Sequence, residues 1–180
     1  MQDSHLIETF VRQKTRLRGN AVNFFIDEVR LPNRKLATRE YLDHPGAVAA
    51  LPILGRDKIV LVRQFRYPVR EVTYEIPAGK LDAGERPLPC VRRELREETG
   101  YAAARIRPLI DYWPTPAFSD EVLHIFLAEG LKPGKVAPDE DEFLDVVTMP
   151  LKRALSWVYA GKIRDSKTVI ALLAYSCRRR

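Results

Sequence analysis

The first third of the chain alternates apolar and polar residues in the way that half-buried strands do. Apolar or β-branched residues occupy most of the alternate positions between residues 7 and 17. Two further extended runs, at 22–29 and 35–42, flank the turn-forming sequence Leu-Pro-Asn-Arg at 31–34. The pattern therefore predicts a hairpin within a strand-rich N-terminal lobe that covers residues 1–45.

The remaining residues, 46–180, mix strand patterns with helix patterns. Pro87 and Pro150 stand where two helices begin, and Gly100 and Gly161 stand where they end. Strands are predicted at 47–54, 59–65, 107–112, 122–128 and 143–149, and helices at about 86–99, at 150–161 and from Asp165 or Ser166 onward. Strands mixed with a few helices predict an α+β or α/β domain.

The segment most informative about chemistry runs from residue 79 to residue 101. On a helix, Glu94 lies three and four residues before Glu97 and Glu98, so the three carboxylates share one face. Glu85 lies in the preceding loop and can fold back towards them. Like charges repel at this spacing, whereas a hard divalent cation such as Mg²⁺ takes oxygen ligands and bridges to substrate phosphates. The segment thus indicates a metal site for phosphate chemistry, and the alternative is a solvated acidic helix face paired with neighbouring arginines.

The full spacing distinguishes between these two interpretations. The fixed positions are Gly79, Glu85, Arg93-Glu94-Leu95, Glu97-Glu98 and Gly100-Tyr101. This spacing resembles the Nudix box, with Tyr101 standing where an aliphatic residue is usual. The resemblance implies a Nudix hydrolase, whose fold is a mixed β-sheet sandwiched between helices in an α/β/α arrangement. Such an enzyme cleaves a nucleoside diphosphate linked to another group.

The same resemblance assigns roles to the residues of the box. It implies that Glu94, Glu97 and Glu98 bind Mg²⁺, or Mn²⁺ in its place, with Glu85 and the backbone carbonyl of Ala78 as further ligands. Arg93 would orient a carboxylate through charge-assisted hydrogen bonds. Gly79 would permit a tight loop, and Gly100 would end the helix.

Sequence outside the box resembles the ADP-ribose pyrophosphatases within this family. Pro116 lies fifteen residues after Tyr101, and the segments at 62–67, 75–79 and 112–121 are similar to the corresponding segments of those enzymes. The resemblance implies hydrolysis of ADP-ribose to AMP and ribose 5-phosphate. The alternatives are another nucleotide sugar such as GDP-mannose, or a module that binds ADP-ribose without cleaving it.

Substrate contacts are expected from both halves of the chain. Arg63 and Arg66 fall on opposite faces of a regular strand, and we favour Arg66 as the residue that contacts the phosphates. The alternative for either arginine is a position on the surface without a role in substrate binding. The remaining expected substrate residues are Phe25, Pro116, Phe118 and Glu121.

A general base must also deprotonate the attacking water. The acidic loop at 138–142 is a candidate source, with Glu140 favoured and Glu142 second. The alternatives are that Glu97 or Glu98 activates the water, or that the loop is simply solvated.

Composition limits the binding partners and the cellular compartment that we expect for this protein. The 180 residues include 30 Lys and Arg against 24 Asp and Glu, a net charge of +6, but the basic residues are scattered except at 178–180. We therefore expect neither a nucleic-acid nor a membrane partner, and no stretch approaches the length of about 18 apolar residues that a span needs. Two lone cysteines and an N-terminus without a signal sequence predict a cytoplasmic protein. Similar enzymes are homodimers that exchange N-terminal strands, so a homodimer is expected.

Overall fold

The structure is a computed structural model that describes residues 3–137 and 143–178. The chain divides into two compact units. Unit 1 comprises Met1–Gly46 and Trp113–Glu121, and unit 2 comprises Ala47–Tyr112 and Val122–Arg180. The boundary predicted after residue 45 lies close to the first division between the units, whereas residues 113–121 belong to unit 1 rather than to the predicted second part.

Unit 1 contains a three-stranded antiparallel sheet in the order β1-β2-β3. Its elements are the short 3-10 helix η1 (Asp3–His5) and the strands β1 (Thr9–Arg18), β2 (Asn23–Arg30) and β3 (Leu36–Asp43). The predicted hairpin is confirmed: β2 and β3 pair along their whole length, and the N–H of Arg34 donates to the carbonyl of Leu31 in the turn.

The expectation that residues 7–17 form a half-buried strand is only partly met. These residues do form a strand, but every residue of β1 is exposed, including Phe10 (65%) and Leu17 (61%). A strand becomes buried only where a second layer covers one of its faces. The described residues place no such layer over β1, which is an edge strand of its sheet.

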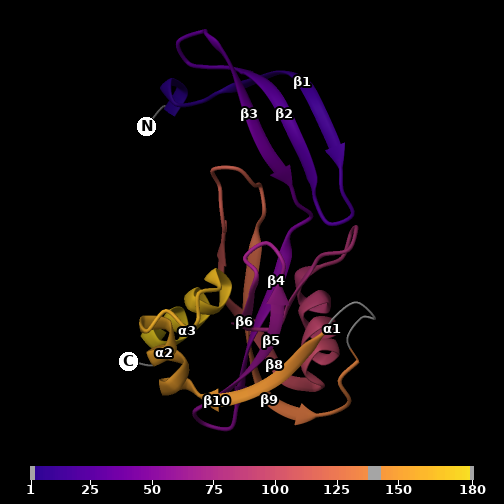
Figure 1. Ribbon diagram of the computed structural model, residues 1–180, viewed down its shortest axis with the longest axis vertical. Coiled ribbons are helices and arrows are strands. Elements are labelled where there is room, and N and C mark those ends of the chain that lie inside the picture. Colours follow the sequence, from indigo (N-terminus) through magenta and orange to yellow (C-terminus); the bar gives the residue numbers. More distant parts are fainter. Residues whose placement is uncertain (1–2, 138–142, 179–180) are drawn as a thin grey trace. The chain divides into compact units, whose positions relative to one another are not determined.

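Unit 2 is built on a mixed seven-stranded sheet (Figure 1). Five strands follow the order β10-β5-β4-β9-β8, with β6 paired to β5 and β7 paired to β4. The pairing of β4 with β9 is parallel, and the other pairings are antiparallel. The strands are β4 (Ala47–Leu54), β5 (Lys58–Arg66), β6 (Glu71–Glu75), β7 (Ala78–Lys80), β8 (Tyr101–Tyr112), β9 (Leu123–Pro133) and β10 (Leu144–Pro150).

Helices cover both faces of this sheet, as Figure 1 shows. The helices are α1 (Pro87–Thr99), α2 (Leu151–Tyr159) and α3 (Ser166–Arg178). Strand β4 is buried over residues 47–53, and alternate residues point to opposite faces. Val48 and Ala50 pack with Leu95 of α1, whereas Ala49 and Leu51 belong to the core that includes Leu172 of α3. The predicted α/β/α arrangement is therefore confirmed.

Helix α1 begins and ends as the sequence predicts. A proline occupies its first turn, and Gly100 follows it in the left-handed conformation with φ 73°, donating its N–H to the carbonyl of Arg96. Glycine is favoured at position 100 for two reasons. Other residues rarely adopt this left-handed conformation, and a Cβ added here would come close to the backbone of residues 134–136. The described helices include none long and apolar enough to cross a membrane.

Strands β7, β8 and β9 differ from the prediction, and β9 runs to Pro133 rather than ending at residue 128. Strand β8 starts at Tyr101 rather than at 107, because its first half pairs with the end of β9 as an edge, where alanines of low strand propensity are tolerated. The tight loop predicted at Gly79 is instead part of the short strand β7, which pairs with residues 47–49 of β4. Pairing with β4 places Ala78 and Gly79 in a defined register beside the buried core.

Candidate active site

Helix α1 places three glutamates on or near its buried side. Glu94 and Glu98 are buried, with 8% and 2% of their surface exposed, and Glu97 is half-buried. Buried carboxylates are uncommon unless paired or bound to a cation. The helix therefore concentrates acidic groups where burial of their charge is energetically unfavourable. Such an arrangement is typical of a functional site.

Arg93 joins these glutamates to the loop before the helix. Its Nη1 donates to Glu94 Oε1 at 2.6 Å and to Glu97 Oε2 at 3.1 Å. Its Nη2 donates to Glu85 Oε2 at 3.2 Å, so Glu85 does fold back towards the helix. The hydrogen bond with Arg93 lowers the pKa of the Glu85 carboxyl, and the hydrogen bond with Glu85 raises the pKa of the Arg93 guanidinium. Arg93 is thus hydrogen-bonded to three of the carboxylates, and its role in orienting them stays a prediction.

Strand β7 lies directly against two of the carboxylates. The N–H of Ala78 donates to Glu98 Oε2 at 3.0 Å. A Cβ added to Gly79 would lie 2.0 Å from the carboxylate carbon of Glu94. Gly79 is thus required because the Glu94 carboxylate occupies the space of a side chain, rather than because of a tight loop. Any larger residue would displace that carboxylate.

The chemistry of this donor set fits a hard divalent cation. One guanidinium bonds to the three carboxylates of Glu85, Glu94 and Glu97, and a fourth carboxylate, that of Glu98, accepts the N–H of Ala78. All the ligand atoms that these side chains offer are oxygens, and Gly79 leaves room for the Glu94 carboxylate. Within residues 3–137 and 143–178, no three acidic, histidine or cysteine side chains are already gathered as a metal cluster. Arg93 instead binds three of the carboxylates, and a cation would compete with it for their oxygens.

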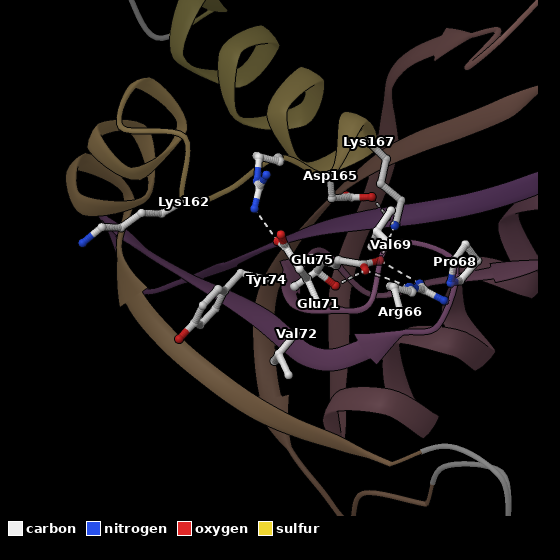
Figure 2. A pocket seen from close by; sticks show the side chains of 12 residues that line it. Arg66, Pro68, Val69, Glu71, Val72, Tyr74, Glu75, Lys162, Asp165 and Lys167 are labelled. Carbon is white, nitrogen blue, oxygen red and sulfur yellow. Dashed lines mark hydrogen bonds and ion pairs between the residues drawn. The ribbon is translucent and has the colours of Figure 1, made fainter.

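A second polar cluster lines a pocket of about 550 Å³ between the β5–β6 hairpin and the start of α3 (Figure 2). At its centre Glu75 is 1% exposed and accepts hydrogen bonds from Arg66 Nε at 2.8 Å and Arg66 Nη2 at 2.7 Å. Thr73 Oγ1 and Lys167 Nζ also donate to Glu75. Burial by itself raises the pKa of Glu75, but Arg66 and Lys167 outweigh it and lower that pKa to about 2.

Sequence reasoning did not assign a role to Glu75 or Lys167. Glu75 directly precedes the apolar segment Ile-Pro-Ala-Gly. A single charged residue next to such a segment is the one sequence feature that could have indicated a buried functional carboxylate. Lys167 lies in the first turn of an apolar helix, where a lysine is ordinarily solvated, yet it is only 9% exposed. The partner that explains its burial is 92 residues away in sequence.

The predicted substrate residues fall into separate places. Arg66 lines the pocket with Glu75, whereas Arg63 pairs with Asp145 at 3.3 Å in a different depression beside β10. Phe25, Pro116, Phe118 and Glu121 belong to unit 1, and their contacts with substrate stay a prediction. Glu140 and Glu142 lie outside the described residues, so their role as base stays a prediction as well.

Comparison with solved structures defines the class of fold. The chain resembles a crystal structure described as an ADP compounds hydrolase, with a TM-score of 0.83 and 22% sequence identity. The match covers 95% of this chain and 94% of the other. The chain therefore shares its overall fold with that structure.

Sequence comparison identifies the family. The NUDIX domain model matches residues 43–172, and the chain belongs to the NUDIX family. It is 44% identical to a methanol dehydrogenase activator from Bacillus methanolicus and 42% identical to an ADP-ribose pyrophosphatase from Bacillus subtilis (strain 168). Each match covers 86% of this chain and 84% of the relative. A GDP-mannose pyrophosphatase from Citrobacter koseri is 36% identical over 74% of this chain and 75% of its own length. The predicted Nudix hydrolase family is confirmed.

Proposed function

We propose that the protein hydrolyses the diphosphate linkage of ADP-ribose, consuming one water and releasing AMP and ribose 5-phosphate. The observation that carries this proposal is the set of carboxylates around Arg93 and Gly79, because it combines an oxygen-rich cation site with a sequence box typical of diphosphate hydrolysis. The 42% identity to a relative named ADP-ribose pyrophosphatase supports this choice of substrate.

The residues of the site take the following roles in this proposal. Glu94, Glu97, Glu98 and the Ala78 carbonyl would hold a divalent cation, which we propose is Mg²⁺, with Glu85 as a further ligand. When bound, such a cation neutralises diphosphate charge and lowers the pKa of a bound water. Arg93 keeps the carboxylates oriented, and Glu140 accepts the proton of the attacking water.

Arg66 is the arginine that we propose binds a phosphate oxygen. Its side chain is 44% exposed at the pocket while two of its nitrogens are fixed by Glu75. A guanidinium held in this way loses little entropy when it binds an anion. The hydrogen bond with Glu75 raises the pKa of Arg66, and the charges of Asp165 and Glu98 raise it further, so the guanidinium stays charged.

GDP-mannose is the second candidate substrate. Several relatives between 35% and 36% identical are named GDP-mannose pyrophosphatase. Both substrates carry a diphosphate between a nucleoside and a sugar, so the cation site serves either one. Contacts with the base and the sugar decide between them.

A substrate panel tests the proposal. We expect ADP-ribose to be cleaved faster than GDP-mannose, NADH, diadenosine polyphosphates or ATP, with AMP and ribose 5-phosphate measured by chromatography. Chelation should abolish turnover, and added Mg²⁺ or Mn²⁺ should restore it. Preference for GDP-mannose would replace the substrate but keep the chemistry. Binding of ADP-ribose without any turnover would contradict hydrolysis and indicate a sensor.

We also propose that the chain forms a homodimer in the cytoplasm, where its two free cysteines remain reduced. Exposed apolar side chains on the sheet of unit 1, among them Phe10, Leu17 and Leu36, support an interface there. Light scattering after size-exclusion chromatography should give twice the 20.7 kDa of one chain. Phe10→Glu should shift the mass towards that of a monomer, and a monomeric wild type would contradict the dimer.

A further inference from the structure

The segment that carries Ala78 and Gly79 is held at its upstream end by the start of α3. The N–H of Ile76 donates to Thr168 Oγ1 at 2.8 Å. Both side chains are fully buried, so neither group can exchange this partner for water without local opening. Two residues later, the N–H of Ala78 donates to Glu98 on α1. The short segment between these bonds therefore spans the sheet from α3 to the proposed cation site.

The residues that surround Thr168 are themselves fixed by an N-terminal cap. Asp165 Oδ2 accepts hydrogen bonds from the N–H of Thr168 at 3.0 Å and from its Oγ1 at 2.6 Å. This is the bonding of an N-cap aspartate to the third residue of a helix. The Thr168 hydroxyl thus donates to the cap and accepts from Ile76, which leaves it one preferred orientation.

Lys167 adds a second connection to the same segment. Its Nζ donates to Asp165 Oδ1 at 2.8 Å and to the Glu75 carboxylate, the residue directly before Ile76. Figure 2 shows Lys167, Asp165, Glu75 and Arg66 converging at the pocket. Two adjacent residues of α3 therefore hold two adjacent residues of the chain that leads into β7.

We propose that Thr168 and Lys167 are positioning residues of the active site, which fix Ile76 and Glu75 and thereby hold Ala78 and Gly79 against Glu98 and Glu94. The inference rests on the proposed function, because it takes these carboxylates and the Ala78 carbonyl as the cation site. It assigns to α3 a role in cation binding although α3 contributes no ligand. A buried segment fixed at both ends keeps the ligand oxygens in one arrangement before the cation arrives.

The test measures cation binding directly, with Mn²⁺ as the probe and electron paramagnetic resonance of the free ion as the readout. Thr168→Val keeps the shape and removes both hydrogen bonds, and it should raise the Kd for Mn²⁺ about tenfold. Thr168→Ser restores the hydroxyl and should return the Kd to within about twofold of the wild type. Ser176→Ala on the same helix, whose hydroxyl bonds only locally to Leu173, is the matched control and should leave the Kd unchanged.

A purely structural role predicts a different result. Thr168→Val would then lower the melting temperature while the folded protein kept the wild-type Kd for Mn²⁺, and that outcome overturns the inference. If Thr168→Val does not fold, Lys167→Gln takes its place, with the same increase in Kd expected and the same result counting against it. Because the measurement needs no substrate, a wild type that binds Mn²⁺ but hydrolyses nothing would refute the proposed function alone.

Discussion

Glu98→Gln is expected to reduce ADP-ribose hydrolysis by about three orders of magnitude with little change in fold. Glu98 is 2% exposed and its carboxylate accepts the N–H of Ala78 at 3.0 Å. The glutamine carbonyl can accept the same hydrogen bond, so β7 keeps its place against α1. The negative charge is lost, and with it the attraction for a cation and for the positive charge of Arg66. Turnover at saturating Mg²⁺ is the measurement.

The control for this variant is Glu129→Gln in the same unit. Glu129 pairs with Arg105 and Arg107 on the β8–β9 surface, so the same chemical change falls outside the site. We expect wild-type turnover from the control, and from Glu98→Gln a melting temperature equal to or above that of the wild type, because one of several neighbouring carboxylates is neutralised. Comparable activity in the two variants would show that the α1 carboxylates do not perform the chemistry.

Local patterns were sufficient to predict most of unit 2. The helix at 86–99 carries its own start and end signals in Pro87 and Gly100, and the box fixes the relation between Glu94 and Glu98 through helical spacing alone. Glu85 could be placed near them because it is only eight residues from Arg93. These features depend on residues close together in sequence, where geometry follows from the type of secondary structure.

Long-range contacts were not predictable in this way. The bond from Ile76 to Thr168 and the contact from Lys167 to Glu75 each join residues 92 positions apart. Strand β7 exists only because β4 is present to pair with it, and its three residues carry no strand pattern of their own. The exposure of β1 was unpredictable for the same reason, since alternation shows which face could be covered but not whether anything covers it.

Glu75→Gln is expected to lower the free energy of unfolding by about 3 kcal/mol at pH 7. Arg66 and Lys167 hold the pKa of Glu75 at about 2, against 4.5 for an ordinary glutamate, and each unit of difference corresponds to about 1.4 kcal/mol. Because the pKa is depressed in the folded state, the stabilisation is fully present above pH 4.5. It is lost as the pH falls from 4.5 through 2. The glutamine variant lacks this contribution at every pH.

Urea unfolding at pH 7 and at pH 3 distinguishes this linkage from a general packing defect. The difference between wild type and Glu75→Gln should shrink markedly at pH 3, since the wild-type protein has by then lost much of the benefit of ionisation. Glu71→Gln is the matched control on the same strand, because Glu71 pairs with Arg164 at the surface, where both side chains are at least half exposed. An exposed pair contributes at most about 1 kcal/mol, so this variant should remain close to wild type at both pH values. Equal losses in the two variants, or a difference for Glu75→Gln that does not change with pH, would contradict a buried ionised Glu75 and remove the electrostatic reason for the burial of Lys167.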